Sequence, residues 1–495
     1  MFFSKSFIPI LKNNPSEAKI KSHQLMLRVG MIKQSSAGIY SWLPLGFKVM
    51  KKIEQIVREE QDRVGVQEIL MPTIQSSEIW KESGRYEDYG EEMLRIKDRQ
   101  NREMLYGPTN EELVTEIFRS SFKSYKSLPQ LLYHIQWKFR DELRPRFGIM
   151  RCREFYMKDA YSFDISDDEA VFSYNKFFLS YLNTFKRMDL SAIPMAADTG
   201  PIGGDLSHEF VIIAETGESK IYADKNIIDI DLNQYELNDG SLSKMREDIS
   251  KIYAVTDEKY KKTDFDNHVK KENQMKTKGI EVGHIFYFSD KYSKPMNCLI
   301  DDKDGKKTSV KMGSYGIGVS RLVGAIIEAN YNNNVMKWPK SVSPFDVVII
   351  PSFNKNNKDT KCFKIIYRKF MSNNLILIDG GMGQELIHRS KVNPDGLWSA
   401  RVMMDNFDLV VDLHKDFIKA GAEAITLNSY SVTPQKLKRY NLEELFIPLQ
   451  KSAIKAAIEA KKSSSFETDI KIIGCLPPLV MSYKTDIGLD KDEAK

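Results

Sequence analysis

The sequence is poor in cysteine, and its few cysteines are not placed as metal ligands or redox pairs. The 495 residues include Cys152, Cys298, Cys362 and Cys475, which lie far apart and form no CxxC pair. This spacing argues against a disulfide framework and against a structural zinc site. We expect buried, reduced thiols in a cytoplasmic protein, and no zinc.

Long hydrophobic runs and a strong net charge are also missing. No stretch of about 20 apolar residues is present, and the N-terminus lacks the features of a signal peptide, so no membrane partner is expected. The net charge is only +5, with 42% hydrophobic and 28% charged residues. This composition suits a soluble globular chain of two or three domains, and it permits RNA binding without indicating it.

A helix is predicted to follow the Gly- and Pro-rich turn after residue 36. Apolar residues from Leu45 to Val57 recur at helical spacing, and Gly65 is expected to end the helix near residue 64. A short strand, Gln67–Met71, should stop at Pro72. A further helix is expected to start near Glu111.

Most other segments before residue 330 have the pattern of strands. Residues 134–163 alternate aromatic and charged side chains, which predicts two antiparallel strands joined by a loop at 144–148. Residues 225–278 are highly charged with little apolar periodicity, which suggests a small or loosely packed insertion. The remaining predictions are strands at 103–106, 207–214, 219–223 and 281–288, and a Gly-rich turn leading into a helix at 312–328.

The character of the chain changes near Met371. Before it, a strand at 347–350 and a helix at 360–370 are expected. After it, strands near 375–378, 424–428 and 470–474 alternate with helices. This alternation predicts βα units and a parallel sheet.

Basic, acidic and aromatic side chains are concentrated between residues 139 and 155. An arginine such as Arg140 on an open sheet offers a fork of donors to a phosphate, and Glu142, two residues along a strand, would share its face. Glu142 suits an adenine amino group, and the Phe155 ring suits stacking on a base. The alternative for an Arg–Glu pair of this kind is a cross-strand ion pair on a solvated sheet.

A glycine-rich segment, Gly313–Arg321, precedes a predicted helix. Glycines let the backbone approach a ligand closely, and a helix N-terminus favours anions. Taken alone, the segment is equally consistent with a tight turn between a strand and a helix.

Taken together, the segments resemble one family. The residues 40–72, 139–163 and 312–328 are similar to the three signature motifs of class II aminoacyl-tRNA synthetases. Over residues 1–370 the sequence resembles the bacterial-type prolyl-tRNA synthetases through AGIYSWLPLG, GPTNEE, KFRDELRPRFGIMRCREFYMKDAYSF, ADTGPIGG, SHEF, GIEVGHIFYF and MGSYGIGVSRL. The resemblance implies an α+β catalytic domain, an antiparallel sheet flanked by helices, over residues 1–340. It also implies a homodimer formed through residues 40–72, although an ordinary core helix is compatible with the same pattern.

The resemblance assigns roles to individual residues. Arg140 would contact the α-phosphate of ATP, Arg321 the far phosphates with help from Arg151, and Glu142 and Phe155 the adenine. The backbone around Ser314, Gly316 and Gly318 would complete the ATP site. Proline would be bound by Thr109, Glu111 and His284, whereas His208 and Glu209 are weaker candidates. Capping of a helix is the alternative role for Thr109 and Glu111.

The implied reaction has two steps and needs no protein nucleophile. The proline carboxylate attacks the α-phosphate of ATP, giving prolyl-adenylate and pyrophosphate, and the terminal ribose of tRNA(Pro) then takes the prolyl group. Positioning and charge stabilisation by Arg140, Arg321 and Mg²⁺ would drive the chemistry. No metal ligand is assigned.

The chain departs from the family pattern in several places. Many relatives carry a large editing domain where this chain has only residues 225–278, so it resembles the shortened form, and a proline pocket excludes alanine poorly by size alone. Asn110 stands where relatives often have His, and Pro201 and Asp205 are atypical in their loop. Residues 341–370 resemble only the first strand and helix of an α/β anticodon-binding domain, so transfer to tRNA could be impaired.

The segment 371–495 resembles a different family, the homocysteine S-methyltransferases, through LILIDGGMGQELIHRS, LWSA, AGAEAITLNSY and GCLPPLVMSYKTD. Those enzymes are (β/α)8 barrels, which need about 250 residues, so this segment implies a partial barrel that ends after the third strand. Their zinc-binding thiolates lie in later strands, and Cys475 matches no zinc position. A gene fusion or a misjoined assembly at Met371 is one hypothesis. A methyltransferase with an appendage and a non-catalytic synthetase-like binding protein are two others.

Overall fold

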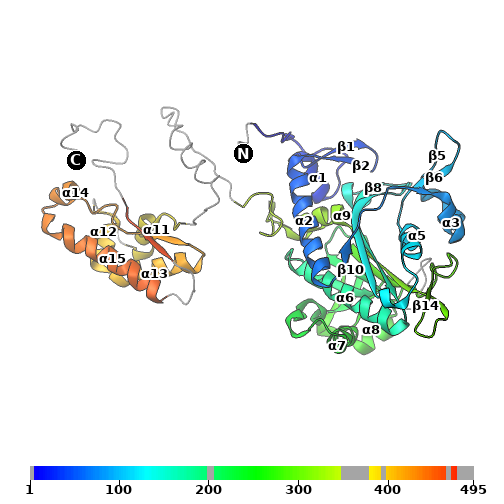
Figure 1. Cartoon of the computed structure of the whole chain (residues 1–495). Helices are drawn as coiled ribbons and strands as arrows, with labels where there is room; N and C mark the ends of the chain where they lie inside the picture. Colours follow the sequence, from blue (N-terminus) through cyan, green and yellow to red (C-terminus); the bar gives the residue numbers. More distant parts are fainter. Residues whose placement is uncertain (1–4, 198–205, 347–377, 392–396, 464–469, 476–495) are drawn as a thin grey trace. The chain divides into compact units, whose positions relative to one another are not determined.

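The computed structural model describes residues 5–197, 206–346, 378–391, 397–463 and 470–475. It divides into two compact units, Met1–Val348 and Ile349–Lys495, which are treated separately (Figure 1). The strand and helix predicted at 347–350 and 360–370, and the atypical Pro201 and Asp205, lie outside the described residues.

The first unit is built on a nine-stranded sheet in the order β10-β9-β12-β11-β13-β16-β8-β7-β3. Neighbouring strands are antiparallel except for the β12–β9 and β3–β7 pairs. One long strand, β13 (Gln274–Tyr287), organises the sheet, because it pairs first with β11 and then with both β10 and β16. The other strands are β3 (Gln67–Glu68), β7 (Gln130–Phe139), β8 (Glu154–Asp164), β9 (Ala192–Ala196), β10 (Leu206–Ile213), β11 (Ser219–Asp224), β12 (Ala254–Thr256) and β16 (Lys311–Ile317).

Three helices pack beside one another against this sheet: α2 (Pro44–Arg63), α6 (Asp167–Lys186) and α9 (Val319–Asn330) (Figure 1). The start and end predicted for α2 are confirmed, with Pro44 in its first turn and Gly65 at a φ of 80° just after it. Helix α6 begins after the N-cap residue Ser166, whose hydroxyl accepts from the Glu169 amide at 3.3 Å. The local signal at α2 explains why its start was predicted from the sequence, whereas α6 was not predicted.

The strand β8 is buried on both faces. Asp159, Tyr161 and Phe163 are buried and alternate along it, and Phe163 stacks on Phe118 of α5 (Glu111–Ser121) at 4.2 Å. On the opposite face, the Asp164 carboxylate accepts from Ser173 of α6 at 2.7 Å. Helices therefore cover both faces of this part of the sheet, and β8 carries polar groups that must find partners inside the protein.

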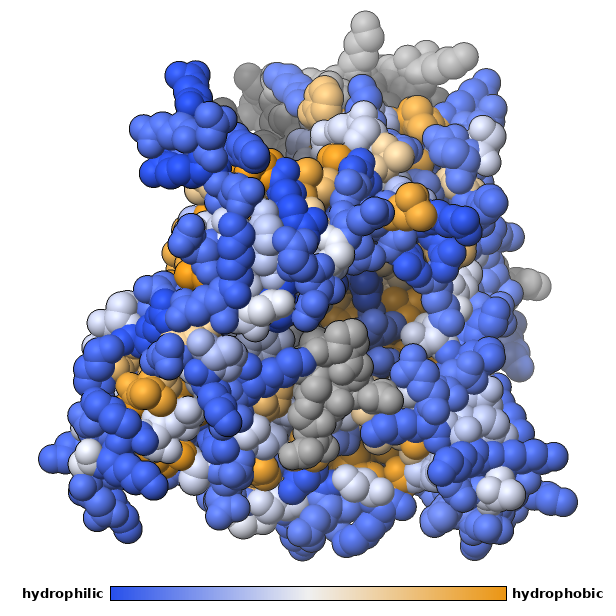
Figure 2. All heavy atoms as spheres, turned by 90° about the vertical axis from the view of Figure 1, so that its right-hand side faces the viewer, coloured by the Kyte–Doolittle hydropathy of each residue, from blue (hydrophilic) through white to orange (hydrophobic). Residues whose placement is uncertain are grey.

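The remaining elements of the first unit are short helices and strands outside the nine-stranded sheet. Figure 2 shows that the face of the unit on the side of α3 and β14 is mostly hydrophilic, with its hydrophobic side chains in separate groups. The elements are α1 (Lys21–Arg28), β1 (Ile32–Ser36), β2 (Ile39–Trp42), β4 (Ile74–Ser76), α3 (Ser77–Glu82), α4 (Arg85–Asp88), β5 (Arg95–Lys97), β6 (Glu103–Tyr106), β14 (Leu299–Asp301), β15 (Lys307–Ser309), β17 (Tyr331–Asn332) and β18 (Val335–Met336).

The segment 225–278 is well packed, so of the two alternatives, a small or a loosely packed insertion, the second is wrong. Its helix α7 (Asp239–Ser250) buries Leu242, Met245 and Ile249 against the main core. Its strand β12 joins the main sheet, and α8 (Lys262–His268) buries Phe265. The apolar residues of α7 keep helical spacing, but the charged residues between them obscured it.

The second unit has its own small core around a parallel pair of strands, β19 (Ala424–Thr426) and β20 (Lys471–Ile473). Ile378 adds a parallel bridge to Ala424. The parallel pairing predicted from the βα alternation is therefore confirmed for the described residues. The helices are α11 (Met382–Ser390), α12 (Ser399–Asp405), α13 (Phe407–Lys419), α14 (Pro434–Lys438) and α15 (Phe446–Ser463).

We expect the second unit to be cleaved faster than the first in limited proteolysis, and to promote aggregation. Ile378, Ile472 and Ile473 leave 57%, 36% and 39% of their surface exposed although they belong to strand pairings. Short strands with exposed apolar faces are weakly held and associate readily. Digestion with thermolysin, followed by intact-mass analysis, would test this. Equal survival of both units would contradict it.

The described cysteines are free thiols, as expected. Cys298 is buried, but Cys152 and Cys475 are only partly so, and Cys362 lies outside the described residues. No helix in the described part of the chain is long and apolar enough to cross a membrane.

Candidate active site

A cavity of about 400 Å³ opens on the sheet of the first unit, a volume within the usual range of ligand pockets. Strands β8, β13 and β16, the loop between β7 and β8, and the start of α9 form its walls. Of the residues singled out in the sequence, its lining includes Arg140, Glu142, Arg151, Phe155, His284, Gly316, Gly318 and Arg321.

Arg140 lies directly after β7, which ends at Phe139. The sequence pattern had suggested that Arg140 lies on a strand, and this prediction is wrong. Its Nη2 donates to the Pro108 carbonyl oxygen at 3.3 Å, and its guanidinium lies 5.3 Å from the centre of the Phe155 ring. The Nε atom is buried and has no hydrogen-bond partner among the described residues. A buried N–H group without an acceptor costs free energy. An anionic ligand that accepts a hydrogen bond from this Nε would remove that cost, so the arrangement suits an anion.

Glu142 and Arg151 form an ion pair at the edge of the cavity, with 2.8 Å between Arg151 Nε and a Glu142 carboxylate oxygen. The backbone amide of Arg144 and the Arg151 side chain lower the pKa of Glu142. Both residues lie in the loop, so the argument from strand alternation was wrong for Glu142, and the ion-pair alternative is realised here within the loop.

The glycine-rich segment forms strand β16, and only Gly318 makes the passage into α9, which corrects the prediction of a turn. A side chain at Gly316 would place its Cβ 2.2 Å from Met157 Cε. Glycine at this position therefore leaves room for the end of the Met157 side chain, which lines the cavity. Arg321 follows in the first turn of α9, where its Nη1 donates to the Glu281 carbonyl oxygen at 2.9 Å.

Two carboxylates face each other near Arg321 and His284. Glu209 on β10 lies opposite His284 of β13 in the strand register, and the His284 Nδ1 lies 3.6 Å from Glu281 and 4.0 Å from Glu209. Burial and the charge of Glu281 raise the pKa of Glu209. Burial alone would raise the pKa of Glu281, but His284 and Arg321 lower it.

The neighbouring His208 does not belong to this group. It points from β10 into the core, where its Nδ1 lies 2.6 Å from the Tyr174 hydroxyl and its ring packs on Phe178. Burial lowers its pKa to about 3, so the imidazole is neutral. The contacts of His208 therefore lie in the core and not at the cavity.

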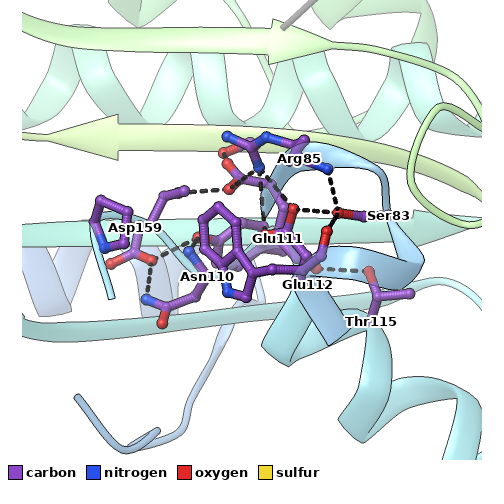
Figure 3. A network of polar contacts seen from close by, with 12 residues as sticks. Ser83, Arg85, Asn110, Glu111, Glu112, Thr115 and Asp159 are labelled. Carbon is purple, nitrogen blue, oxygen red and sulfur yellow. Dashed lines mark hydrogen bonds and ion pairs between the residues drawn. The ribbon is translucent and has the colours of Figure 1, made fainter. Parts of the chain in front are cut away.

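Thr109, Glu111 and Ser314 form a cluster that is not part of the cavity lining. The Glu111 carboxylate accepts from the Thr109 hydroxyl at 2.5 Å and from the Ser314 hydroxyl at 3.1 Å. It also contacts Arg85 (Figure 3). The residue that caps α5 is Asn110, and its side chain makes no capping hydrogen bond, so the capping alternative is not realised by Thr109.

Three residues of the site escaped the sequence analysis. Glu281 lies within a segment that was noted, but nothing marked its side chain. Arg85 and Asp159 meet the GPTNEE loop only through folding, since they contact Glu111 and Asn110 across 26 and 49 positions of the chain. The Ser83-Gly84-Arg85 break between two helical stretches was the only local signal.

Comparison with known proteins identifies the family. The tRNA synthetase class II core domain (G, H, P, S and T) matches residues 94–330. Proline--tRNA ligase of Pelagibacter ubique (strain HTCC1062) is 70% identical over 447 residues, which cover 88% of this chain and all of that protein. The chain belongs to the proline–tRNA ligase family. The enzyme of the same name from Hyphomonas neptunium is 58% identical over 351 residues, 71% of this chain and 80% of that protein.

Solved structures support the same catalytic fold. Prolyl-tRNA synthetase of Giardia lamblia, in complex with prolyl-adenylate, has a TM-score of 0.51 at 15% identity over 73% of this chain. That of Cryptosporidium parvum, complexed with L-proline and AMP, has a TM-score of 0.50 at 14% identity over 75% of this chain. The chain covers 60% and 61% of those two proteins, so at these identities they show the class II catalytic fold alone.

The C-terminal segment matches a second family. The homocysteine S-methyltransferase family matches residues 376–495, in agreement with the resemblance noted in the sequence. The alignment with the Pelagibacter ligase covers 88% of this chain, and residues 1–375 make up a smaller share than that. The alignment therefore also extends into this segment. The two similarities therefore overlap beyond residue 376.

Proposed function

We propose that this member of the proline–tRNA ligase family activates proline with ATP and transfers it to tRNA(Pro) in the cytoplasm. The observation that carries the proposal is the buried Nε of Arg140, a donor without a partner among the described residues, on the wall of the cavity. An α-phosphate oxygen placed there would satisfy it.

The proposed ATP site follows from the lining of the cavity. Phe155 offers its ring to adenine, and Glu142 offers a carboxylate that is ionised at neutral pH. The far phosphates would meet Arg321 and Arg151 beside the backbone of Gly316 and Gly318, with Ser314 on the same strand.

The proposed proline site lies between this cavity and the GPTNEE loop. Glu111 and Thr109 supply acceptors for the secondary ammonium group, and His284 closes the site from β13. Arg140 lies between the two sites, because it contacts both Pro108 and Phe155. The carboxylate of proline would thereby be held next to the α-phosphate for in-line attack.

We propose one place for magnesium in this arrangement. Within the described residues no set of three or more His, Cys, Asp or Glu side chains is arranged around a metal position. However, Mg²⁺ commonly uses one or two carboxylates with water and substrate phosphates, and Glu209 and Glu281 repel each other beside Arg321. These two residues would hold Mg²⁺, which would neutralise phosphate charge. We assign no zinc site.

The proposed domain organisation has three parts. Residues 1–340 form the catalytic domain, with 225–278 as a vestigial insertion. Residues 341–370 begin an anticodon-binding domain, and 371–495 form a partial methyltransferase-like barrel. The family match to 376–495 and the parallel β19–β20 pair support the last assignment. A shortened anticodon-binding domain would weaken the transfer step more than activation.

We also propose a homodimer formed through residues 40–72. Val49, Ile53 and Val57 of α2 are fully buried in the core of the unit. In the same segment, however, Phe47 and Leu70 leave 48% and 76% of their surface exposed. Burial of these two side chains against a second copy would account for their exposure.

The alternative functions fit the observations less well. A homocysteine methyltransferase is not favoured, because the relatives that match most of the chain are named proline--tRNA ligases. A non-catalytic binding protein would not need the complete set of Arg140, Glu142 and Arg321 around one cavity. A fused or misjoined chain remains a hypothesis about the origin of residues 371–495.

Proline-dependent exchange of pyrophosphate with ATP tests the proposal on the full chain. We expect exchange with proline, weaker exchange with alanine, and competition by both alanine and cysteine. Charging of tRNA(Pro), measured separately, reports the transfer step. Absence of exchange from a folded protein would refute the activation step, whereas exchange without charging would restrict the proposal to adenylate formation.

A further inference from the structure

Arg85 is a largely buried cation beside the GPTNEE loop, with 18% of its side chain exposed. One of its guanidinium nitrogens, Nη1, lies 3.2 Å from Glu111 and 3.0 Å from Glu112 (Figure 3). Glu112 also accepts from the Ser83 hydroxyl at 2.9 Å. One guanidinium group therefore bridges two consecutive carboxylates at the start of α5.

Three aromatic rings surround the same guanidinium group. Its carbon lies 5.1 Å from the Trp80 ring, 5.5 Å from Tyr89 and 5.1 Å from Tyr292. These rings come from α3, from the residue after α4 and from the segment after β13. A planar cation held among aromatic faces has little freedom to move.

The charges in this cluster do not cancel. Glu112 is fully buried and Glu111 leaves 5% of its side chain exposed, so two carboxylates share one guanidinium. Burial raises the pKa of Glu112, with Arg85 opposing and Glu111 adding to this rise. When both carboxyls are ionised, these three groups carry one more negative charge than Arg85 neutralises. Glu111 is the carboxylate that contacts Thr109 and Ser314, and it is the one assigned to proline under the proposed function.

We propose that Arg85 and Glu112 are positioning residues whose opposite charges neutralise each other. Arg85 then orients Glu111, and the negative charge of Glu111 stays available to a cationic secondary amine. This proposal rests on the assignment of Glu111 to proline under the proposed function. It explains why a second acid, Glu112, lies beside Glu111. With Glu112 neutral, Arg85 would pair with Glu111 alone, and the site would carry no net charge for the amine.

The double substitution separates this mechanism from a purely structural role. We expect Glu112→Gln to raise the KM for proline in pyrophosphate exchange about 10- to 100-fold, the range for losing a charge-assisted contact, while the KM for ATP stays within about twofold. Arg85→Met combined with Glu112→Gln should reverse part of this rise in the KM for proline, because Glu111 is again the one charge of the cluster, although Arg85 no longer orients it. Glu116→Gln is the matched control: it lies one turn further along α5, pairs with Arg119, and should change nothing.

Direct binding of prolinol, a cationic amine without a carboxylate, distinguishes the possible failures. Calorimetry should show weaker binding to Glu112→Gln and recovery in the double variant. An unchanged KM and unchanged prolinol binding in a folded Glu112→Gln protein would overturn the proposal and leave the proposed function standing. The unmodified chain could also show no exchange while prolinol binding weakens in Glu112→Gln and recovers in the double variant. In that case the proposed function would fail, and the proposal for Arg85 and Glu112 would stand. An unmodified chain that neither exchanged nor bound prolinol would overturn both.

Discussion

Replacement of Arg140 by alanine is expected to lower kcat/KM for proline-dependent pyrophosphate exchange by about 10²- to 10³-fold, the range for losing one donor to a developing charge. The reason is the position of the guanidinium group, which contacts Pro108 on one side and Phe155 on the other and leaves a buried Nε donor for a ligand. Arg140→Lys should recover little, because an ammonium group lacks the planar fork of donors.

Arg144→Ala is a suitable control for this experiment. Arg144 is an exposed residue of the same loop, and its side chain does not belong to the cavity lining. We expect its exchange rate to match that of the unmodified chain. An Arg140→Ala protein that keeps its melting temperature and loses less than about threefold in rate would contradict the role assigned to Arg140.

Replacement of Asp159 by asparagine is expected to destabilise the first unit by about 3–5 kcal/mol, the usual cost of breaking a buried ion pair. Asp159 is 3% exposed and accepts from Lys138 at 3.1 Å, from Asn110 at 2.9 Å and from Tyr161 at 2.6 Å. Burial would raise the pKa of this carboxyl, but Lys138 and His134 hold it below its usual range. Asparagine keeps the shape and leaves Lys138 without a counter-charge.

A double-mutant cycle would identify the ion pair as the cause. Combining Asp159→Asn with Lys138→Met removes both charges, and we expect it to regain part of the lost stability. Urea unfolding followed by tryptophan fluorescence reports mainly on the first unit, since four of the five tryptophans lie in residues 5–346. A single substitution as stable as the unmodified protein, or a double variant less stable than both single ones, would contradict this account.

Several features of the catalytic unit were predictable because they depend on neighbours along the chain. The start and end of α2 follow from Pro44 and Gly65, and the antiparallel pair β7–β8 follows from alternating side chains. The segment 225–278 was misjudged, because charged residues at the surface of α7 mask a buried face that only packing reveals. Arg140 and Glu142 were placed on a strand because the point where β7 ends has no sequence signal.

The sequence by itself determined the family, the order of the motifs and the residue types proposed to bind ATP and proline. These depend on residues close together in the chain, whose identities and spacing can be read directly. Only the tertiary structure decided which side chains meet: His284 and Glu281 beside Glu209, His208 turned into the core, and Arg85 between two acids. Strand register and helix packing set these contacts, and both arise from burial across the whole fold, which no local pattern encodes.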